Sequence, residues 1–482
     1  MSVADVLEPL VRATLGGTAL PVRIDCWDGS SLGPPDATLR VRFASRRALR
    51  RLLWAPNELG FARAYVAGDV EVEGDLLAAM DLLERFADPA RGPGLRMGAE
   101  TTAAIVRAVL RLRAAGLPAK PPREEIRLGG RRHSLRRDAR AVSHHYDVGN
   151  DFYALVLGPS MVYSCAYFVE PPSAGYTLTD AQHAKLDLVS RKLGLQPGMR
   201  LLDVGCGWGA LVVHAARRYG VKAVGVTLSQ QQADFARARV EAEGLRDRVE
   251  IRVEDYRDVT DGPYDAIASI GMAEHVGLSQ LPSYCARLYS LLRPGGRLLN
   301  HAISRRPGPP GDPKGDKTSF IHRYVFPDGE LHPISTMVGA IEDVGFEVRD
   351  VESLREHYAL TLRAWVDNLE RSWDEAVSLS SPGRARVWRL YMAGSALSFQ
   401  SNRLGVNQVL AVRTGPGGGS EMPRTRTEWL RNGSGMDPRL RPNVSPAPHD
   451  RPDPGGLTDQ VVALGDVRSA LGGLAVRRGG GG

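Results

Sequence analysis

Between about residue 141 and residue 413, short apolar runs alternate with longer segments whose apolar positions recur at helical spacing. The stretch "MRLLDVG" is a continuous apolar run of the kind that a buried strand needs, and "ALVVHAARRYG" after it has the spacing of a helix. "AQHAKLDLVSRKLGL" and "QQQADFARARVEAEG" are further helical segments, whereas "KAVGVTL", "RVEIRV", "YDAIASIG", "GGRLLNHAIS" and "FEVRDVESL" read as strands. Alternating strands and helices are typical of a mostly parallel sheet covered by helices. The pattern predicts an α/β domain over residues 141–413.

Residues 1–118 have a different pattern and predict a smaller α+β domain. "PVRIDCWDGSSLGPPDATLRVRF" reads as two alternating strands around a Gly/Pro turn, and "RRALRRLLWAPNELGFARAYVAGDVEVEGD" has helical periodicity. "TTAAIVRAVLRLRAAGLP" is a basic amphipathic helix that Gly116 and Pro118 close. Such a helix suits a membrane surface, although packing on its own domain is the commoner use.

The positive charge is concentrated between these two domains. The chain of 482 residues has a formal net charge of +7, and the segment from Lys120 to Arg140 contains eight basic and three acidic residues. A basic run of this kind attracts the phosphates of nucleic acids or of anionic lipids, and it is also typical of a solvated linker. We interpret residues 119–140 as a basic linker.

The remaining composition narrows the class of protein. The four cysteines have no paired spacing, which argues against a disulfide framework and against a CxxC zinc site, so we expect no metal. We find no secretory pattern at the N-terminus and no apolar run of membrane-spanning length, and we expect a cytoplasmic protein. Residues 414–482 are rich in Gly and Pro and predict a disordered tail, in which Trp429 is a candidate local anchor.

The most informative stretch is "LLDVGCGWGALVVHA", in which a strand ends at Asp203 and three glycines precede a helix. Gly205, Gly207 and Gly209 allow a tight turn and a close approach of the backbone to a ligand at the helix N-terminus. A dinucleotide site is the first alternative. A carboxylate before the first glycine can bind an ammonium group or a ribose, whereas it would repel a pyrophosphate. The order of the motifs, with "LLRPGGRLL" before a late strand, also favours a class I S-adenosylmethionine-dependent methyltransferase. The Walker A pattern is absent, which argues against nucleoside triphosphate hydrolysis.

Two further loops complete the predicted cofactor site. After the second strand, "VTLSQQQ" offers Thr227, the backbone of Leu228, Ser229 and Gln232 in place of the acid that commonly binds the ribose, and Ser229 can also cap the next helix. After the third strand, Asp255 in "VEDYRD" is placed for the adenine amine, unless it is simply a loop carboxylate that faces water.

Six separate motifs in one order resemble a known family. "HHYDVGNDFYALVLGPSMVYSCAYF", "LDVGCGWG", "VTLSQQQ", "SIGMAEHVG", "FIHRYVFPDGE" and "HYALTLRAW" resemble the cyclopropane-fatty-acyl-phospholipid synthases and their mycolic-acid cyclopropane synthase relatives. The resemblance covers residues 141–413 and implies the class I Rossmann-like methyltransferase fold. More weakly, residues 1–118 resemble the smaller lipid-binding domain of the phospholipid-acting members.

The resemblance implies a reaction and a set of site residues. The family transfers a carbon from S-adenosylmethionine to the cis double bond of unsaturated acyl chains in membrane phospholipids, and a bound bicarbonate removes a proton so that a cyclopropane ring closes. By the matching motifs, the bicarbonate pocket here comprises Cys165, Glu274, His301, Ile303 and Tyr358. Cys165 would then frame an anion pocket instead of acting as a nucleophile.

The same resemblance assigns more cofactor contacts and shows two departures. Tyr163 and Ser164 match a pair that contacts the cofactor, and Tyr146 is placed over its methionine end. Many relatives have a larger residue at the position of Ala273, and some have a cysteine at the position of Ser395. Both changes bear on the acyl pocket, so the product is left open.

Several alternatives and partners follow. Loss of a different proton would give a 10-methylene chain, which a separate reductase would convert to a methyl branch. A nucleic-acid methyltransferase is disfavoured because the basic run has no interleaved aromatic residues, and a non-enzymatic lipid-binding protein is a further alternative. We expect peripheral binding at the inner membrane face through an anionic membrane surface, no nucleic acid partner, and a possible homodimer.

Overall fold

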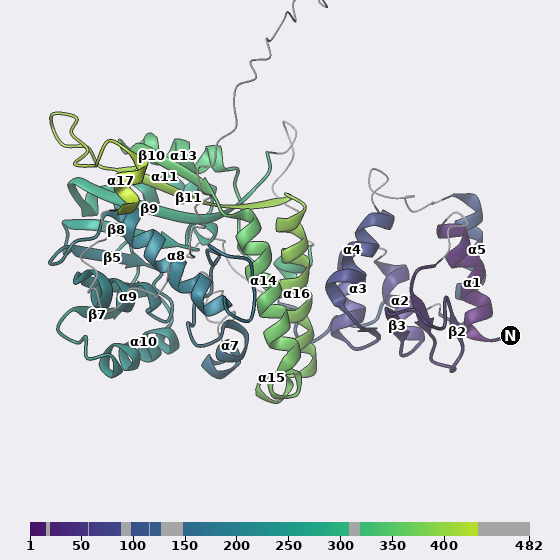
Figure 1. Cartoon of the computed structure of the whole chain (residues 1–482). Helices are drawn as coiled ribbons and strands as arrows, with labels where there is room; N and C mark the ends of the chain where they lie inside the picture. Colours follow the sequence, from purple (N-terminus) through teal and green to yellow (C-terminus); the bar gives the residue numbers. More distant parts are fainter. Residues whose placement is uncertain are drawn as a thin grey trace, which may run out of the picture. The chain divides into compact units, whose positions relative to one another are not determined.

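The computed structural model describes residues 1–15, 20–55, 57–87, 98–114, 116–126, 148–307 and 319–431 (Figure 1). Most of the predicted basic linker, Tyr146, and the tail beyond residue 431 lie outside the described residues.

The N-terminal part contains one small sheet with helices around it. Its elements are α1 (Val3–Thr14), β1 (Arg23–Asp25), β2 (Ser31–Leu32), β3 (Arg40–Phe43), α2 (Arg46–Trp54), α3 (Glu58–Val66), β4 (Val70–Glu73), α4 (Leu76–Ala87) and α5 (Ala99–Arg111). The sheet order is β2-β1-β3-β4.

Two details of this sheet differ from the sequence-based expectation. The two strands predicted around the Gly/Pro turn are β1 and β3, but they pair in parallel, and β2 pairs antiparallel with β1 on its other side. The segment predicted to be helical contains strand β4, because "VEVE" alternates between buried and exposed positions and stands between Gly68 and Gly74, which both have positive φ.

The second part has the predicted alternation of strands and helices. Its elements are α7 (Asn150–Leu157), α8 (Leu178–Leu193), β5 (Arg200–Val204), α9 (Ala210–Tyr219), β6 (Lys222–Thr227), α10 (Gln230–Ala242), β7 (Val249–Val253), β8 (Tyr264–Ile270), η1 (Ala273–His275), η2 (Leu278–Gln280), α11 (Leu281–Leu291), β9 (Leu292–Arg305), α12 (Phe320–Tyr324), α13 (Ile334–Glu342), β10 (Glu347–Ser353), α14 (Arg355–Arg371), α15 (Trp373–Leu379), α16 (Pro382–Gln400), β11 (Leu404–Val412) and α17 (Arg426–Arg431).

These strands form one sheet of order β10-β11-β9-β8-β5-β6-β7. Strands β5 to β9 pair in parallel, and β11 runs antiparallel to both of its neighbours. The chain order reverses between β5 and β8, and ligands of open α/β sheets bind beyond the carboxyl ends of the strands at such a point. The predicted Rossmann-like α/β fold is confirmed.

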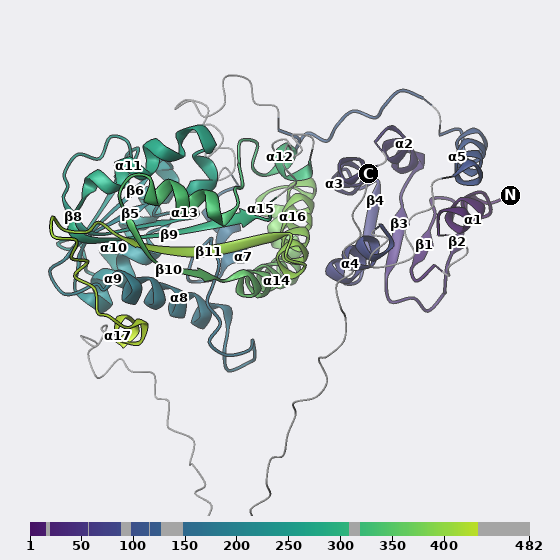
Figure 2. The same cartoon turned by 90° about the horizontal axis from the view of Figure 1, so that it is seen from above.

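Helices cover both faces of this sheet (Figures 1 and 2). Helices α8, α9 and α10 share one apolar core with one face, and α11 and α13 share another with the opposite face. A third core is rich in aromatic residues and includes α7, α14 and α16. In it, the centroid of the Tyr163 ring lies 5.4 Å from that of Trp365, 5.8 Å from that of Trp388 and 5.6 Å from that of Tyr153.

The start of the predicted disordered tail has a defined structure. Strand β11 ends at Val412, and α17 follows at residues 426–431. The indole of Trp429 donates a hydrogen bond to the Pro423 carbonyl at 2.6 Å, and the Arg349 guanidinium lies over its ring. Residues 414–431 are therefore ordered within a tail that is predicted to be largely disordered, and Trp429 anchors this segment as expected.

Candidate active site

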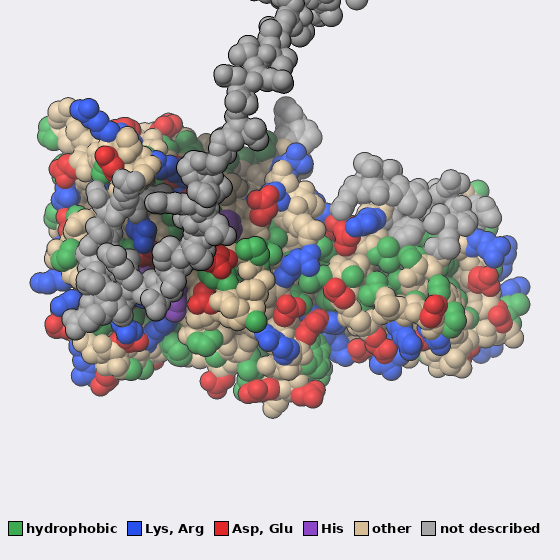
Figure 3. Space-filling model, in the orientation of Figure 1, with side chains coloured by type: hydrophobic (Ala, Val, Ile, Leu, Met, Phe, Trp, Pro, Cys, Tyr) green, Lys and Arg blue, Asp and Glu red, His purple; other side chains and the backbone are tan. Residues whose placement is uncertain are grey.

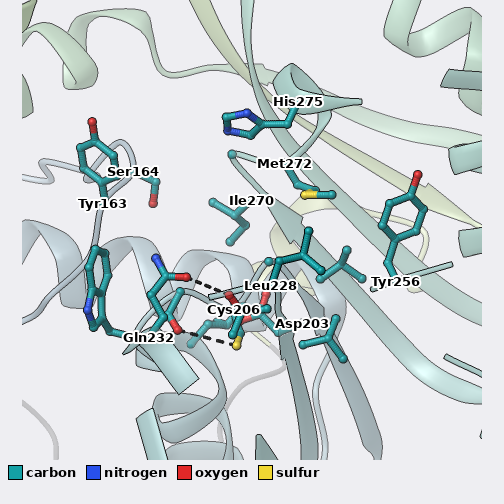
Figure 4. Close-up of a pocket in the computed structure, with 18 of the residues that line it drawn as sticks. Tyr163, Ser164, Asp203, Cys206, Leu228, Gln232, Tyr256, Ile270, Met272 and His275 are labelled. Atoms are coloured by element: carbon teal, nitrogen blue, oxygen red, sulfur yellow. Dashed lines mark hydrogen bonds between the residues drawn. The ribbon is translucent and has the colours of Figure 1, made fainter. Parts of the chain in front are cut away.

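A cleft of about 180 Å³ lies at the carboxyl ends of β5, β6 and β8. Its lining includes Tyr163, Ser164, Lys185, Asp203, Gly205, Cys206, Gly207, Trp208, Thr227, Leu228, Gln232, Asp255, Tyr256, Met272 and His275. Figure 4 shows Tyr163 and Ser164 at one side of this cleft and Tyr256 at the other, with Asp203 and Leu228 between them. The cleft thus coincides with the sheet position at which the cofactor is predicted.

The glycine loop follows β5 as predicted. Gly205, Gly207 and Gly209 have φ angles of +81°, +54° and +78°, which L side chains rarely adopt. A Cβ atom on Gly209 would also lie only 3.0 Å from Cβ of Ala236. Gly205 and Gly207 line the cleft, whereas Gly209 caps the N-terminus of α9 behind it.

A buried charge pair faces the cleft beside this loop. Lys185 from α8 and Asp203 at the end of β5 are both buried. Burial raises the pKa of Asp203 to about 7, although Lys185 opposes this rise. Burial likewise lowers the pKa of Lys185 to about 8. Lys185 Nζ also donates a hydrogen bond to Ser164 Oγ at 3.0 Å, so it links two residues of the predicted cofactor site.

The loop after β6 is held by its own hydrogen bonds. Thr227 Oγ1 donates to Gln232 Oε1 at 2.8 Å and accepts from the backbone N–H of Ser229 at 3.2 Å. Thr227, Leu228 and Gln232 line the cleft. The Ser229 side chain caps α10 by accepting from the backbone N–H of Gln232, and it is absent from the cleft lining.

Asp255 lines the cleft but already has a partner. Its carboxylate accepts hydrogen bonds from the Arg257 guanidinium at 2.8 and 2.6 Å and from the Arg257 backbone N–H at 3.0 Å. Burial raises the pKa of Asp255, but these contacts outweigh burial and the pKa is lowered. The carboxylate is therefore ionised and oriented, which suits an acceptor for an amine.

The structure brings two of the residues predicted for the anion pocket, Glu274 and Ile303, into contact. Glu274 is buried in η1, and its Oε1 accepts a hydrogen bond from the backbone N–H of Ile303 at 2.7 Å, while Oε2 has no hydrogen-bond partner. Burial raises the pKa of Glu274 to about 7, against the lowering effect of the Ile303 hydrogen bond. None of the five residues predicted for the anion pocket lines the cleft itself, but Ser164 and His275, which do, adjoin Cys165 and Glu274 in the chain.

The other members of this set come from β9, from α14 and from the loop between α7 and α8. His301 is buried on β9, two residues before Ile303 on the same face of the strand, and its Nδ1 lies 3.3 Å from Gln408 Nε2. Burial lowers the pKa of His301 to about 3, so the ring is neutral. Tyr358 on α14 and Cys165 belong to the aromatic core, against which Ile303 packs.

Cys165 has the environment of an inert thiol. It is fully buried, and its Sγ donates to the carbonyls of Ala166 at 3.1 Å and of Leu354 at 3.5 Å. Burial raises its pKa far above the ordinary value for a thiol. A thiolate nucleophile requires a lowered pKa, so this geometry argues against nucleophilic catalysis.

The structure adds residues that the motifs did not indicate. Lys185, Trp208, Tyr256, Met272 and His275 line the cleft. Trp208 belongs to the glycine motif, so the sequence could have indicated it. No local pattern indicates Lys185, because its burial depends on how α8 packs. Within the described ranges, no group of three or more His, Cys, Asp or Glu side chains could hold a metal ion.

Comparison with known proteins agrees with the geometry. The sequence profile of the family described as mycolic acid cyclopropane synthetase matches residues 133–409. The chain is 43% identical over 434 residues to a probable fatty acid methyltransferase of Mycobacterium tuberculosis, an alignment that covers 88% of this chain and 97% of that protein. It is 34% identical over 420 residues to the tuberculostearic acid methyltransferase of the same species, with coverage of 86% and 92%. Among solved structures, a mycolic acid cyclopropane synthase in complex with SAH and CTAB has a TM-score of 0.53 and 36% identity, over 57% of this chain and 97% of that one.

Proposed function

This chain belongs to the mycolic acid cyclopropane synthetase family, and we propose that it forms cyclopropane fatty acids by adding one carbon to the cis double bond of unsaturated chains in membrane phospholipids. It is an S-adenosylmethionine-dependent methyltransferase of fatty acyl chains. The phospholipid substrate, the ring product and a bicarbonate base are the finer parts of the proposal.

The cleft fits S-adenosylmethionine. A buried carboxylate, Asp203, stands at the glycine loop, where it can accept the amino group of the methionine end, and Asp255 is held ionised at the far side. The cofactor supplies an electrophilic methyl group on a sulfonium. The chain's own residues must orient the alkene towards that methyl group and exclude water.

The reaction releases one proton in each turnover. The π electron pair of the alkene forms a new C–C bond as the C–S bond breaks, and a carbocation remains on the acyl chain. Loss of a proton from the added methyl group leaves an electron pair that closes the ring. The aromatic core around Trp365 and Trp388 keeps water away, and ring faces stabilise a nearby cation.

The observation that carries the proposal is the position of Glu274. A buried carboxylate with one oxygen fixed by Ile303 and the other without a hydrogen-bond partner is suited to share a proton with a small oxyacid. We propose that bicarbonate binds among Glu274, His301, Ile303, Tyr358 and the Cys165 backbone, and takes the proton.

A second product is favoured by the comparisons. Relatives that match more than four fifths of this chain are named fatty acid methyltransferases, and a cyclopropane synthase structure matches 57% of it. The first C–C bond is the same, but loss of a proton from elsewhere would give a 10-methylene chain, which a partner reductase would reduce.

We propose that the protein works at the surface of an anionic membrane, on the inner face, with the N-terminal domain contributing lipid contacts. No helix in the part of the chain that the structure describes is both long enough and apolar enough to cross a membrane. On the face drawn in Figure 3, basic and acidic side chains are interspersed, so the excess positive charge is not gathered there. A homodimer is part of the same proposal.

The test is the lipid profile of a host that has no such enzyme and expresses this chain. Phospholipids with one cis double bond should gain one carbon. Because a ring and a methylene branch have equal mass, NMR of the isolated acyl chains distinguishes them. Ring methylene signals support the first product, signals of an exocyclic =CH₂ group support the second, and unchanged lipids refute both.

A further inference from the structure

A second, smaller cavity lies behind Glu274. It has a volume of about 20 Å³, which is enough for one water molecule, and Glu274, Asn300, Ala302, Ser304 and Glu330 are among its lining residues. Asn300, Ala302 and Ser304 lie on one face of β9. Ile303 also lines the cavity, so the cavity adjoins the predicted anion pocket at Glu274 and Ile303.

Two buried oxygen atoms at this cavity have no hydrogen-bond partner. They are Glu274 Oε2 and Asn300 Oδ1, and both side chains are at least nine-tenths buried. Unpaired acceptors of this kind are costly unless a water molecule donates to them. Asn407, which also lines the cavity, donates with its Nδ2 to Ser304 Oγ at 2.8 Å and has a second N–H available to such a water.

The cavity connects Glu274 to half-buried polar groups. Glu330 and His332 also line it, with His332 Nε2 3.8 Å from Glu330 Oε2 and side-chain exposures of 15% for His332 and 27% for Glu330. The backbone fixes this arrangement, because the N–H of Glu330 donates to the Glu274 carbonyl at 2.9 Å and the N–H of Leu278 donates to Glu330 Oε2 at 3.0 Å.

We propose that this cavity holds a water molecule through which the proton released in each turnover passes from Glu274 to Glu330 and His332 and then to solvent. The inference rests on the proposed function, which leaves one proton per cycle among buried side chains. Glu274 receives the proton from the base at Oε2 and gives it from the same oxygen to the water molecule in the cavity, so the base is restored for the next cycle. The pKa of about 7 for Glu274 allows it to gain and lose a proton near neutral pH.

Two substitutions test the route. Glu330→Gln keeps an acceptor for the Leu278 N–H but removes the receiving charge, and Ala302→Val fills the cavity with two methyl groups. In both variants, a single turnover with bound bicarbonate should proceed within about twofold of the wild-type rate. Steady-state formation of S-adenosylhomocysteine should fall about tenfold. This factor is below the range of about 100-fold or more that general acid–base catalysis commonly contributes.

The control is Glu342→Gln, which removes an exposed carboxylate from the end of α13 and should leave both rates unchanged. The proposal is overturned if both test variants keep the wild-type steady-state rate. It is also overturned if the single-turnover and steady-state rates fall equally, because an equal fall indicates a structural effect. If the wild-type protein alkylates no lipid at all, the proposed function is wrong. This result differs from both outcomes that would overturn the proton route.

Discussion

The Glu274 carboxylate is fixed by the backbone of Ile303, since Oε1 accepts the Ile303 N–H at 2.7 Å. This contact joins the loop after β8 to the C-terminal end of β9, and it leaves Oε2 as the oxygen that can exchange a proton. The proposed base site and the proposed exit cavity therefore share Glu274 and Ile303.

Replacing Glu274 with Gln should lower turnover by at least about tenfold, because the amide cannot accept the proton. The amide oxygen still accepts the Ile303 N–H, and the residue does not line the cofactor cleft, so S-adenosylmethionine affinity should change little. Steady-state kinetics and isothermal titration calorimetry measure the two quantities. A loss of cofactor affinity in step with activity would contradict the assignment.

Tyr358→Phe should also lower turnover about tenfold, because the hydroxyl group that binds the proposed oxyacid is lost. The ring should stay in place, since it packs on Phe399 with centroids 4.6 Å apart and edge-on to Trp365. Tyr219→Phe, a change at a buried tyrosine on α9, is the matched control and should keep full activity. If both variants lose activity equally, the Tyr358 hydroxyl has no specific role.

Cys165→Ser should keep much of its activity. The serine hydroxyl can donate to the Ala166 or Leu354 carbonyl in place of the thiol, and the proposed contact with the anion comes from the backbone N–H. The rate of product formation should be compared with that of the wild type after circular dichroism has shown that the variant is folded. Complete inactivity of a folded variant would favour a nucleophilic cysteine.

Hydrophobic periodicity predicted most strands of the large sheet but gave no prediction for β11. Two polar residues, Asn407 and Gln408, interrupt its apolar run, and both are buried because they pair with Ser304 and His301 on β9. Those partners are about 100 residues away in the chain, so a local pattern cannot reveal them.

The motif positions predicted many of the residues that line the cleft, because glycine loops and strand ends fix the backbone there. Tertiary packing decided what the motifs could not. Lys185 lies in a helix where lysine normally faces solvent, yet it is buried against Ser164. Arg257 follows Asp255 by two residues, and its hydrogen bonds to the Asp255 carboxylate depend on the conformation of the loop.

Acid should destabilise the protein partly through His301. Its pKa is about 3 in the folded protein and 6.5 in the unfolded chain, so between these values the unfolded chain binds more protons and stability falls as pH falls. From pH 7 to pH 5 this histidine costs about 2 kcal/mol of unfolding free energy. His301→Gln should lose correspondingly less stability over the same interval in urea denaturation. Equal losses in the two proteins would show that the buried neutral histidine makes no such contribution.

Lys185→Met should weaken S-adenosylmethionine binding about tenfold, the value of one hydrogen bond that involves a charged group. Two effects act together, because Ser164 loses its donor and the pKa of Asp203 rises further without the neighbouring cation, so that Asp203 is less ionised at neutral pH. Lys192→Met is the matched control on the same helix, because Lys192 is also buried but pairs with Asp350 at 3.2 Å, away from the cleft. Calorimetry should show weaker binding for the Lys185 variant only. If both variants bind the cofactor equally weakly, the role of Lys185 is structural only. If the affinity is unchanged in both variants, Lys185 and Asp203 do not act together in binding the cofactor.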